Sequence, residues 1–580
     1  MIDSSGESEY TYDYQGRLKT YKPPIGLDSG YYVEYDYNNA GQKTQVRITN
    51  GTTTTYNVTY DYFANGWLKN VKYNGDTIAE YSYDEVGNRT RQLNGNGTYT
   101  DYTYSQTDAR YMMDSITHYK MAGGTPVPAT DSKLTNSIVY ARDAVGNPLS
   151  ITDSVGKWQY GYDANNRLIA AVPPNPVPEQ PAGGPYSYDW VGNRLNPPAD
   201  PNPMVYNAAD QLMSWPGMHT YTYYPDGSLQ YEKNAAGTSV LKTYTYTLDG
   251  LLSTAEFNGK TLTNLWDADK NRVGFSVNSV DHTFVYDTTA GIPAVIKEDN
   301  VYYVREPNGG LVTRVSGSNT SYYHFDQLGS TRLLTDADGD VTDEYAYDAY
   351  GFLLSHNRRA GSVDQPYQYV GELGYYTHYQ EPEFRLLQLG VRFYDAEMAG
   401  FTQRDPIPSD KSSEYFYVDG GVFRYTDPSG NNAVKIGIAG IAVALDVLCA
   451  RRGFEAGDKF RSSDNKLGRP NHFMAHCVAA CSVTRCIPRT FLTCGLWYAV
   501  SSGRINDRAI VGRSQTIIAG LLMELWQYTP WGKPEGDDKQ WGNNYWLVNT
   551  KWNVMGAECG LSKTTCFQCC YKKAQDIGQY

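Results

Sequence analysis

A repeated tyrosine–aspartate motif constrains the fold of this chain more than any other feature of its sequence. "YTYDYQGRLKTY" at Tyr10 returns as "VEYDYNNAGQK" at Val33, "VTYDYFANGWLKNV" at Val58 and "YSYDEVGNRTRQL" at Tyr81. Their aspartates, at positions 13, 36, 61 and 84, are 23, 25 and 23 residues apart, and later copies begin at Gly161, Tyr186 and Tyr345. A repeat of this length indicates stacked supersecondary units in place of one ordinary core.

Each copy predicts a strand, a turn and a second strand. Alternating tyrosines give the period of two that places side chains on one face of a strand. In the turn, an aspartate can accept a hydrogen bond from the backbone two residues on, and the following glycine tolerates positive φ. Of the 53 tyrosines, 48 lie in residues 1–431, and tyrosine favours half-buried sheet surfaces. We therefore expect a mainly β fold, in which stacked hairpins bury a continuous face.

The C-terminal quarter differs in charge and in sulfur content. Residues 432–580 carry 18 Lys and Arg against 11 Asp and Glu, which leaves a net charge of −20 for residues 1–431. All nine cysteines lie at or after Cys449. Such asymmetry is typical of separate modules, and an acidic body could hold a basic tail. We expect a repeat region over 1–390, a closing segment over 391–431 and a distinct domain over 432–580.

The repeat alone also allows a β-solenoid or propeller used for cell-surface adhesion. "YYHFDQLGSTRLLTDADGDVTDEYAYDAYG" from Tyr322 and "RFYDAEMAGFTQRDPIPSDKSSEYFYVDGGVFRYTDPSG" from Arg392 add a more specific signal. Together with the repeats, they resemble the RHS/YD-repeat family and its RHS-associated core. The resemblance covers residues 8–430 and extends to the C component of tripartite ABC (Tc) toxin complexes. It implies a spiral of hairpins that forms a hollow β-cocoon around a variable C-terminal toxin.

The resemblance further implies that the closing segment is an intramolecular aspartyl protease. Its motif maps onto Arg392, Asp405 and Asp427, with cleavage beside Asn431 and Asn432. Two neighbouring carboxyl groups do not both ionise easily, so one can act as an acid while the other activates water. Arg392 could hold one of them in its charged form. The alternative is that the two Asp-Pro pairs only form turns, and Asn431 departs from the bulky apolar residue common in the family.

Residues 432–580 predict a small, mainly helical, cysteine-rich domain, because several segments keep apolar residues three and four apart. Three states of its cysteines stay open. One is a zinc site formed by His472, His476, Cys566 and Cys569. Another is reduced core cysteines. The third is disulfides, for which the candidates are Cys477, Cys481, Cys486, Cys494, Cys559, Cys566, Cys569 and Cys570.

The sequence shows no classical signal peptide, and its longest apolar run, Ile436–Leu445, is too short to span a bilayer. We expect a protein made in the bacterial cytoplasm and delivered by a type VI or Tc-like injection apparatus. A cognate immunity protein and a second shell-forming subunit are the other expected partners. We expect no cofactor for the shell, and zinc is the candidate for the tail. Nucleic acid is not an expected partner of the shell. The tail would be a hydrolase or nuclease, or a membrane-active pore former; the adhesion alternative leaves it non-toxic.

Overall fold

The computed structural model describes residues 2–3, 5–105, 112–174, 185–195, 203–406, 413–431 and 434–435. The chain separates into two compact units, 1–439 and 440–580, and the second lies outside the described residues. The expected C-terminal helices, the zinc candidates and the disulfide candidates all fall there. Within the described part of the chain, no helix is long and apolar enough to cross a membrane.

Two large antiparallel sheets, joined in chain order, make up most of the first unit. The 15-stranded sheet comprises β3 (Glu9–Tyr12), β4 (Leu18–Lys22), β5 (Tyr32–Tyr37), β6 (Lys43–Thr49), β7 (Thr54–Tyr62), β8 (Leu68–Tyr73), β9 (Asp76–Tyr83), β10 (Arg89–Asn94), β11 (Thr98–Tyr104), β12 (Met113–Lys120), β13 (Ser132–Lys133), β14 (Ile138–Arg142), β15 (Pro148–Thr152), β16 (Lys157–Tyr162) and β17 (Leu168–Val172).

The 16-stranded sheet comprises β18 (Val205–Tyr206), β19 (Leu212–Trp215), β20 (His219–Tyr223), β21 (Leu229–Asn234), β22 (Val240–Tyr246), β23 (Leu252–Phe257), β24 (Lys260–Trp266), β25 (Arg272–Val277), β26 (Val280–Asp287), β27 (Ala294–Glu298), β28 (Val301–Arg305), β29 (Leu311–Ser316), β30 (Asn319–Phe325), β31 (Thr331–Thr335), β32 (Val341–Tyr347) and β33 (Leu353–Arg358).

The smaller elements are β1 (Ile2–Asp3), β2 (Gly6–Glu7), η1 (Gly371–Leu373), β34 (Tyr376–Thr377), η2 (Pro382–Phe384), β35 (Leu387–Leu389), β36 (Arg392–Asp395), β37 (Gly400–Phe401), η3 (Tyr417–Gly420), β38 (Tyr425–Thr426) and β39 (Val434–Lys435). Strands β34–β37 form a sheet of their own, and β38 pairs with β39. The prediction of a mainly β fold built from consecutive hairpins is confirmed.

The predicted turn chemistry is also confirmed. Asp84 accepts the backbone N–H groups of Val86 and Asn88 on one carboxylate oxygen, at 3.1 and 2.8 Å. Gly87 adopts φ +96°, and the ladder shifts register beside the turn, as in a type I turn followed by a bulge. The sequence had not predicted the second of these bonds, from the Asn88 N–H four positions on. It adds a further hydrogen bond across the turn.

The predicted alignment of two copies was wrong. Asp36 and Asp61 lie inside β5 and β7, where they pair with Lys19 at 2.6 Å and Lys72 at 2.8 Å. The turns of these copies begin two residues later, at Asn38 and Phe63. A strand places successive side chains on opposite faces, so the Tyr-Asp pair itself does not fix the position of the turn.

The tyrosine that precedes the turn links neighbouring hairpins. Its hydroxyl donates to the carbonyl that begins the second strand of the preceding hairpin. This bond joins Tyr37 to Leu18 at 2.9 Å, Tyr62 to Lys43 at 2.6 Å, Tyr83 to Leu68 at 2.9 Å and Tyr162 to Pro148 at 2.9 Å. A phenol suits this position because its ring packs in the sheet while its hydroxyl satisfies a backbone acceptor.

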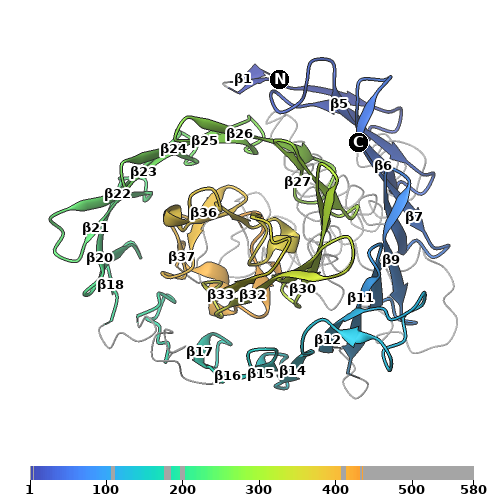
Figure 1. The fold of residues 1–580 in the computed structure, drawn as a ribbon. Helices are drawn as coiled ribbons and strands as arrows, with labels where there is room; N and C mark the ends of the chain where they lie inside the picture. The colour runs from blue at the N-terminus through green and yellow to red at the C-terminus, as the bar shows by residue number, and fades with distance from the viewer. Residues whose placement is uncertain are drawn as a thin grey trace, which may run out of the picture. The chain divides into compact units, whose positions relative to one another are not determined.

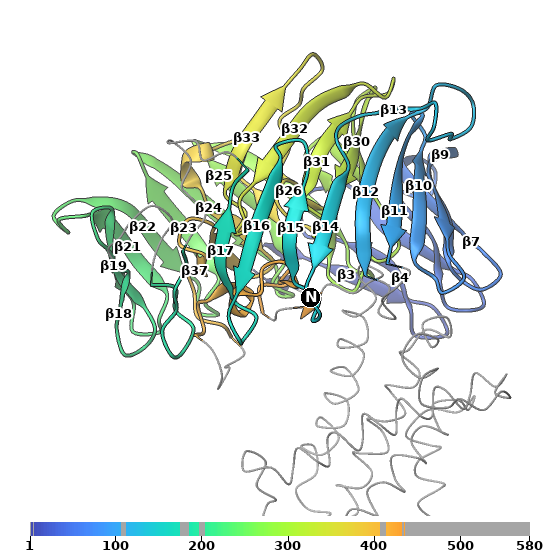
Figure 2. The ribbon, with the colours of Figure 1, turned by 90° about the horizontal axis from the view of Figure 1, so that it is seen from below.

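The band of strands curves so that its later part packs inside its earlier part. Figure 1 shows β27–β33 within the curve of β5–β12, with β36 and β37 further inside, and Figure 2 shows the outer strands side by side. One apolar cluster unites side chains of β4–β9 with side chains of β26–β30, and two others unite the outer strands with residues 349–423. Polar bonds also join these layers, such as Tyr56 to the Tyr303 carbonyl at 3.0 Å. The described residues between 349 and 423 therefore pack against both sheets.

Candidate functional site

The three residues of the sequence-predicted protease motif come together from three separate elements. Arg392 opens β36, whose four residues are all buried. Asp405 follows β37 by four positions and is partly exposed, while Asp427 directly follows β38 and is 2% exposed. Because β35, β36 and β37 form a tight meander, Arg392 and Asp405 return to the same end of this small sheet. The hairpin β38–β39 then brings Asp427 to them.

Arg392 binds both carboxylates through one nitrogen atom. Its Nη2 donates to Asp405 Oδ2 at 2.9 Å and to Asp427 Oδ2 at 3.1 Å. The two carboxylate oxygens are therefore no more than about 6 Å apart. Sequence reasoning expected the arginine to hold one carboxylate, whereas the structure has it hold both. A single guanidinium thus holds the two carboxyl groups close together and favours the charged form of the one that is ionised.

The rest of the Arg392 guanidinium binds backbone. Its Nε donates to the carbonyl of Gly430, and its Nη1 donates to the carbonyl of Glu414 at 3.1 Å. The face of the group lies over the ring of Phe401, 3.6 Å from its centroid. Every nitrogen of the guanidinium is therefore occupied in a site closed by an aromatic ring, which fixes its orientation.

The segment Asp427–Asn431 is folded back onto the same arginine. Gly430 has φ +67°. A Cβ there would overlap the Leu389 carbonyl oxygen and lie 2.9 Å from the backbone nitrogen of Arg392. Only glycine allows this approach. The backbone N–H of Asn431 donates to Asp427 Oδ1 at 3.1 Å. The peptide group between Gly430 and Asn431 is therefore held at its oxygen by Arg392 and at its nitrogen by Asp427.

Two tyrosines at this site were missed from the sequence. The Asp427 backbone N–H donates to the Tyr375 hydroxyl at 2.6 Å, and Tyr375 and Tyr417 share a hydrogen bond of 2.7 Å. Burial, together with the Asp427 carboxylate, raises the pKa of Tyr375 well above 10, so its hydroxyl stays neutral. Tyr375 lies 52 residues before Asp427, outside the quoted motif, and it is one tyrosine among many.

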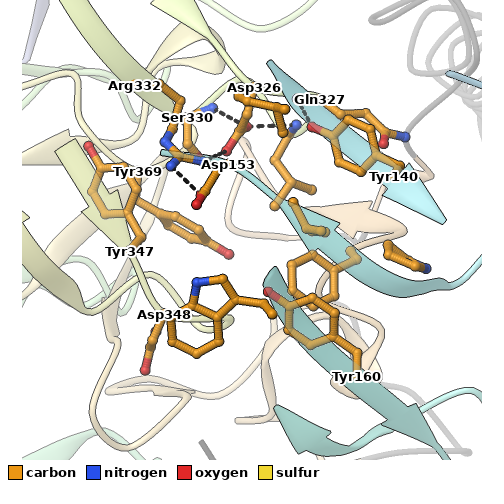
Figure 3. A pocket seen from close by; sticks show the side chains of 16 residues that line it. Tyr140, Asp153, Tyr160, Asp326, Gln327, Ser330, Arg332, Tyr347, Asp348 and Tyr369 are labelled. Carbon is orange, nitrogen blue, oxygen red and sulfur yellow. Dashed lines mark hydrogen bonds and ion pairs between the residues drawn. The ribbon is translucent and has the colours of Figure 1, made fainter. Parts of the chain in front are cut away.

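A small cavity of about 50 Å³ lies elsewhere in the first unit, and its lining includes none of Arg392, Asp405 and Asp427 (Figure 3). It is lined by β14–β16, by the turns around Asp326 and Asp348, and by Phe423. Across it, Arg332 binds Asp153 at 2.7 Å. Burial raises the pKa of Asp348 to about 6. The cavity has room for ordered water, and its residues join the outer sheet to the inner turns.

Among the described residues, no group of three or more His, Cys, Asp or Glu side chains is arranged to hold a metal ion. The sequence-predicted zinc ligands His472, His476, Cys566 and Cys569 lie outside those residues, as do all eight disulfide candidates. Asn431 is described, but Asn432, the other residue at the expected cleavage position, is not.

Comparison with known proteins relates part of this chain to one family and to several larger proteins. Residues 147–415 match the family described as Teneurin YD-shell. The tRNA3(Ser)-specific nuclease WapA of Bacillus spizizenii is 25% identical over 375 residues, which cover 62% of this chain and 15% of that protein. The Double-stranded DNA deaminase toxin A of Burkholderia cenocepacia is 23% identical over 329 residues, 50% of this chain and 22% of that protein.

The chain thus spans less than a quarter of the length of these curated relatives. Among solved structures, the TcdB2-TccC3 complex matches with a TM-score of 0.49 and 17% identity, over 72% of this chain and 24% of that one. The resemblance to the RHS/YD-repeat family that the sequence motifs indicated is confirmed by the YD-shell match and by these two relatives.

Proposed function

We propose that this chain, an RHS/YD-repeat shell protein, is a toxin carrier that cuts itself next to Asn431 and thereby frees its C-terminal segment. The observation that carries the proposal is the position of Arg392. It binds Asp405, Asp427 and the Gly430 carbonyl together. An aspartyl protease works with two neighbouring carboxyl groups beside a peptide carbonyl, and here one buried guanidinium gathers all three.

The cleavage would proceed by attack of water on a carbonyl carbon beside the arginine. One carboxylate accepts a proton from the attacking water, and the oxygen that gains negative charge is stabilised by the guanidinium. The other carboxyl group gives a proton to the departing nitrogen. Asp405 is the more exposed of the two, with 18% of its side chain accessible against 3% for Asp427, so Asp405 suits water activation. Asp427 lies beside the Asn431 nitrogen, whose N–H donates to its Oδ1 at 3.1 Å; with a proton on its carboxyl group, Asp427 suits the second role and ends ionised, while Asp405 ends with the proton taken from water.

Two peptide bonds are candidates for the cut. The resemblance implies the bond after Asn431, whereas the peptide held at both polar atoms is the one before it. Both would separate the described shell from residues 432–580. Cleavage would occur once per chain, because the substrate segment is part of the same molecule.

The cargo would be residues 432–580, carried within a hollow cocoon formed by the repeats. The relatives named as a nuclease and a deaminase toxin support a toxic tail, and a hydrolase or nuclease is the activity to test first. A pore former is the alternative. Delivery would use a type VI or Tc-like apparatus, with an immunity protein protecting the producing cell and a second subunit completing the shell.

Intact mass of the denatured full chain tests the proposal. Wild type should give two fragments that divide next to Asn431, and Asp427→Asn and Asp405→Asn should each give one intact chain. Asp419→Asn is the matched control, because Asp419 is exposed and lies in the same segment; it should be cut like wild type. The fragment masses also identify which bond is broken.

An intact wild-type chain, or normal cutting of Asp427→Asn, would make these aspartates structural. Expression of residues 432–580 with and without export tests the carrier role separately. If the tail is harmless in both compartments, the adhesion function becomes the better explanation.

A further inference from the structure

We propose that Tyr375 is a positioning residue of the self-cleavage site, which holds the backbone of Asp427 and is itself held by Tyr417. This inference rests on the proposed function and goes beyond the arginine and the two aspartates. The juxtaposition that carries it is the 2.6 Å hydrogen bond from the Asp427 N–H to the Tyr375 hydroxyl. Tyr375 and Tyr417 are both 0% exposed.

The local sequence anchors Tyr375 firmly. It lies between η1 and β34, and the next residue, Tyr376, donates its hydroxyl to Glu298 at 2.6 Å. Tyr375 and Tyr376 belong to different apolar clusters, as alternation along an extended chain requires. The first unit therefore holds this segment from two sides, and the Tyr375 hydroxyl has a fixed place.

The hydrogen bonds allow only one role for Tyr375 toward Asp427. A backbone N–H can only donate, so the phenol oxygen is the acceptor. The bond to Tyr417 then either takes the proton of Tyr375 or fills its second acceptor site. A proton donated to Tyr417 would make the Tyr375 oxygen a better acceptor. Tyr417 thus supports the bond to the Asp427 nitrogen through Tyr375.

This anchor matters because the Tyr375 hydroxyl holds the backbone nitrogen of Asp427, whereas other bonds hold its carboxylate and its carbonyl, which accepts the Gly430 N–H at 3.2 Å. Its carboxylate binds Arg392 and the Asn431 N–H, and Pro428, which follows, offers no N–H. Fixing the backbone nitrogen of Asp427 sets the direction in which its side chain points. A displacement of about 1 Å in a reacting group can lower a rate by about 100-fold. Loss of the hydroxyl should therefore slow cleavage without removing either carboxylate.

The test measures the rate of processing in the full chain. The chain is made by cell-free synthesis, synthesis is stopped, and samples quenched in denaturant over time are resolved by intact mass. Tyr375→Phe should slow processing by about 10- to 100-fold, and Tyr417→Phe should slow it less. The double variant should be no slower than Tyr375→Phe, because the two residues act in series. Tyr394→Phe is the matched control.

Tyr394 is a suitable control because it is also 0% exposed, packs 4.5 Å from the Tyr417 ring and donates to the Tyr350 carbonyl, not to Asp427. Its variant should be cut at a rate close to that of wild type. A second measurement keeps the size of the side chain: 3-fluorotyrosine at position 375 weakens the oxygen as an acceptor. It should give a rate between those of Tyr375→Phe and wild type.

Each other outcome contradicts the inference. A wild-type rate for Tyr375→Phe removes the role of its hydroxyl. Three other results would assign the slowing to altered packing. They are equal slowing by Tyr394→Phe, additive effects of Tyr375→Phe and Tyr417→Phe, and an unchanged rate with 3-fluorotyrosine at position 375. These results leave self-cleavage standing, provided that wild type is cut and Asp427→Asn is not. An intact wild-type chain overturns both proposals together.

Discussion

Arg392 donates its Nε–H to the backbone carbonyl of Gly430, a residue 38 positions further along the chain. This bond connects the small sheet β34–β37 to the segment that ends the described shell. One buried arginine thereby holds the Gly430 backbone and both carboxyl groups of the proposed site, since the nitrogen atoms not used on Gly430 reach Asp405, Asp427 and Glu414.

Replacing Arg392 by lysine should abolish processing. An ammonium group keeps the charge but cannot reach three directions from one plane, so we expect a loss of at least about 100-fold in the fraction cut per unit time. Intact mass measures this. Arg404→Lys is the control, since Arg404 is in the same segment but 52% of its side chain is exposed; it should be cut normally. Equal processing of both variants would contradict a role for the guanidinium geometry.

Gly430→Ala should also stop processing, for a steric reason. The new methyl group would overlap the Leu389 carbonyl, which must push the Asp427–Asn431 segment away from Arg392. Gly41→Ala is the control: Gly41 has φ +83° but open space around its Cβ position, so it incurs backbone strain of only about 1 kcal/mol. Mass analysis of both variants should show loss of cutting for Gly430→Ala alone. Normal cutting of Gly430→Ala would show that the close approach is dispensable.

Asp348→Asn should stabilise the shell above pH 6. Burial raises the pKa of Asp348 to about 6, so the folded state favours the protonated form, and this contribution is lost as the pH rises through 6. Asparagine can make the same turn, because Asn38 accepts the N–H groups of Ala40 and Gln42 at 3.0 Å each. We expect a gain of about 1–2 kcal/mol at pH 8 and little change near pH 4, measured as the midpoint of shell unfolding.

The control for this prediction is Asp143→Asn. Asp143 occupies the same turn position, and burial would raise its pKa, but the hydrogen bonds from Asn147 lower it overall. That variant should therefore destabilise the shell at pH 8. If Asp348→Asn and Asp143→Asn changed the stability of the shell in the same direction at pH 8, the hydrogen-bond partners of the turn carboxylate would not determine the effect.

The shell should lose stability as the pH falls from about 6.5 toward 3. His118 in β12 and His324 in β30 face each other across the two layers, with ring centroids 5.1 Å apart. Burial lowers the pKa of His118 well below 6.5, helped by His324 and Arg332, and lowers that of His324 to about 3. Both rings are therefore neutral when folded, and the unfolded chain binds more protons in this range.

His324→Gln should flatten this pH dependence by about 2 kcal/mol between pH 7 and pH 4. Glutamine stays neutral and can keep a bond to Thr335, which His324 Nε2 contacts at 3.0 Å. Denaturant unfolding of the full chain across this range measures the slope. An unchanged slope in the His324→Gln variant would exclude the histidine pair as the source.

Sequence reasoning succeeded where a pattern is local. The turn at Asp84 depends on a carboxylate, a backbone N–H two residues on and a glycine with positive φ, and all three are encoded within five residues. It failed at Asp36 and Asp61, because a strand residue and a turn residue can both follow a tyrosine. The cross-layer histidine pair and Tyr375 could not be identified either, since their partners lie 206 and 52 positions away in the chain.

The sequence by itself determined the kind of element, the repeat and the motif residues Arg392, Asp405 and Asp427, because strand alternation, turn chemistry and a rare motif are properties of neighbouring residues. Only the tertiary structure decided that Arg392 binds both carboxylates and the Gly430 carbonyl, and that Tyr375 holds Asp427. Those contacts exist because the β34–β37 sheet, the β38–β39 hairpin and the segment before β34 pack together. Long-range contact of this kind depends on how whole sheets bury their faces together, and no short stretch of sequence carries that information.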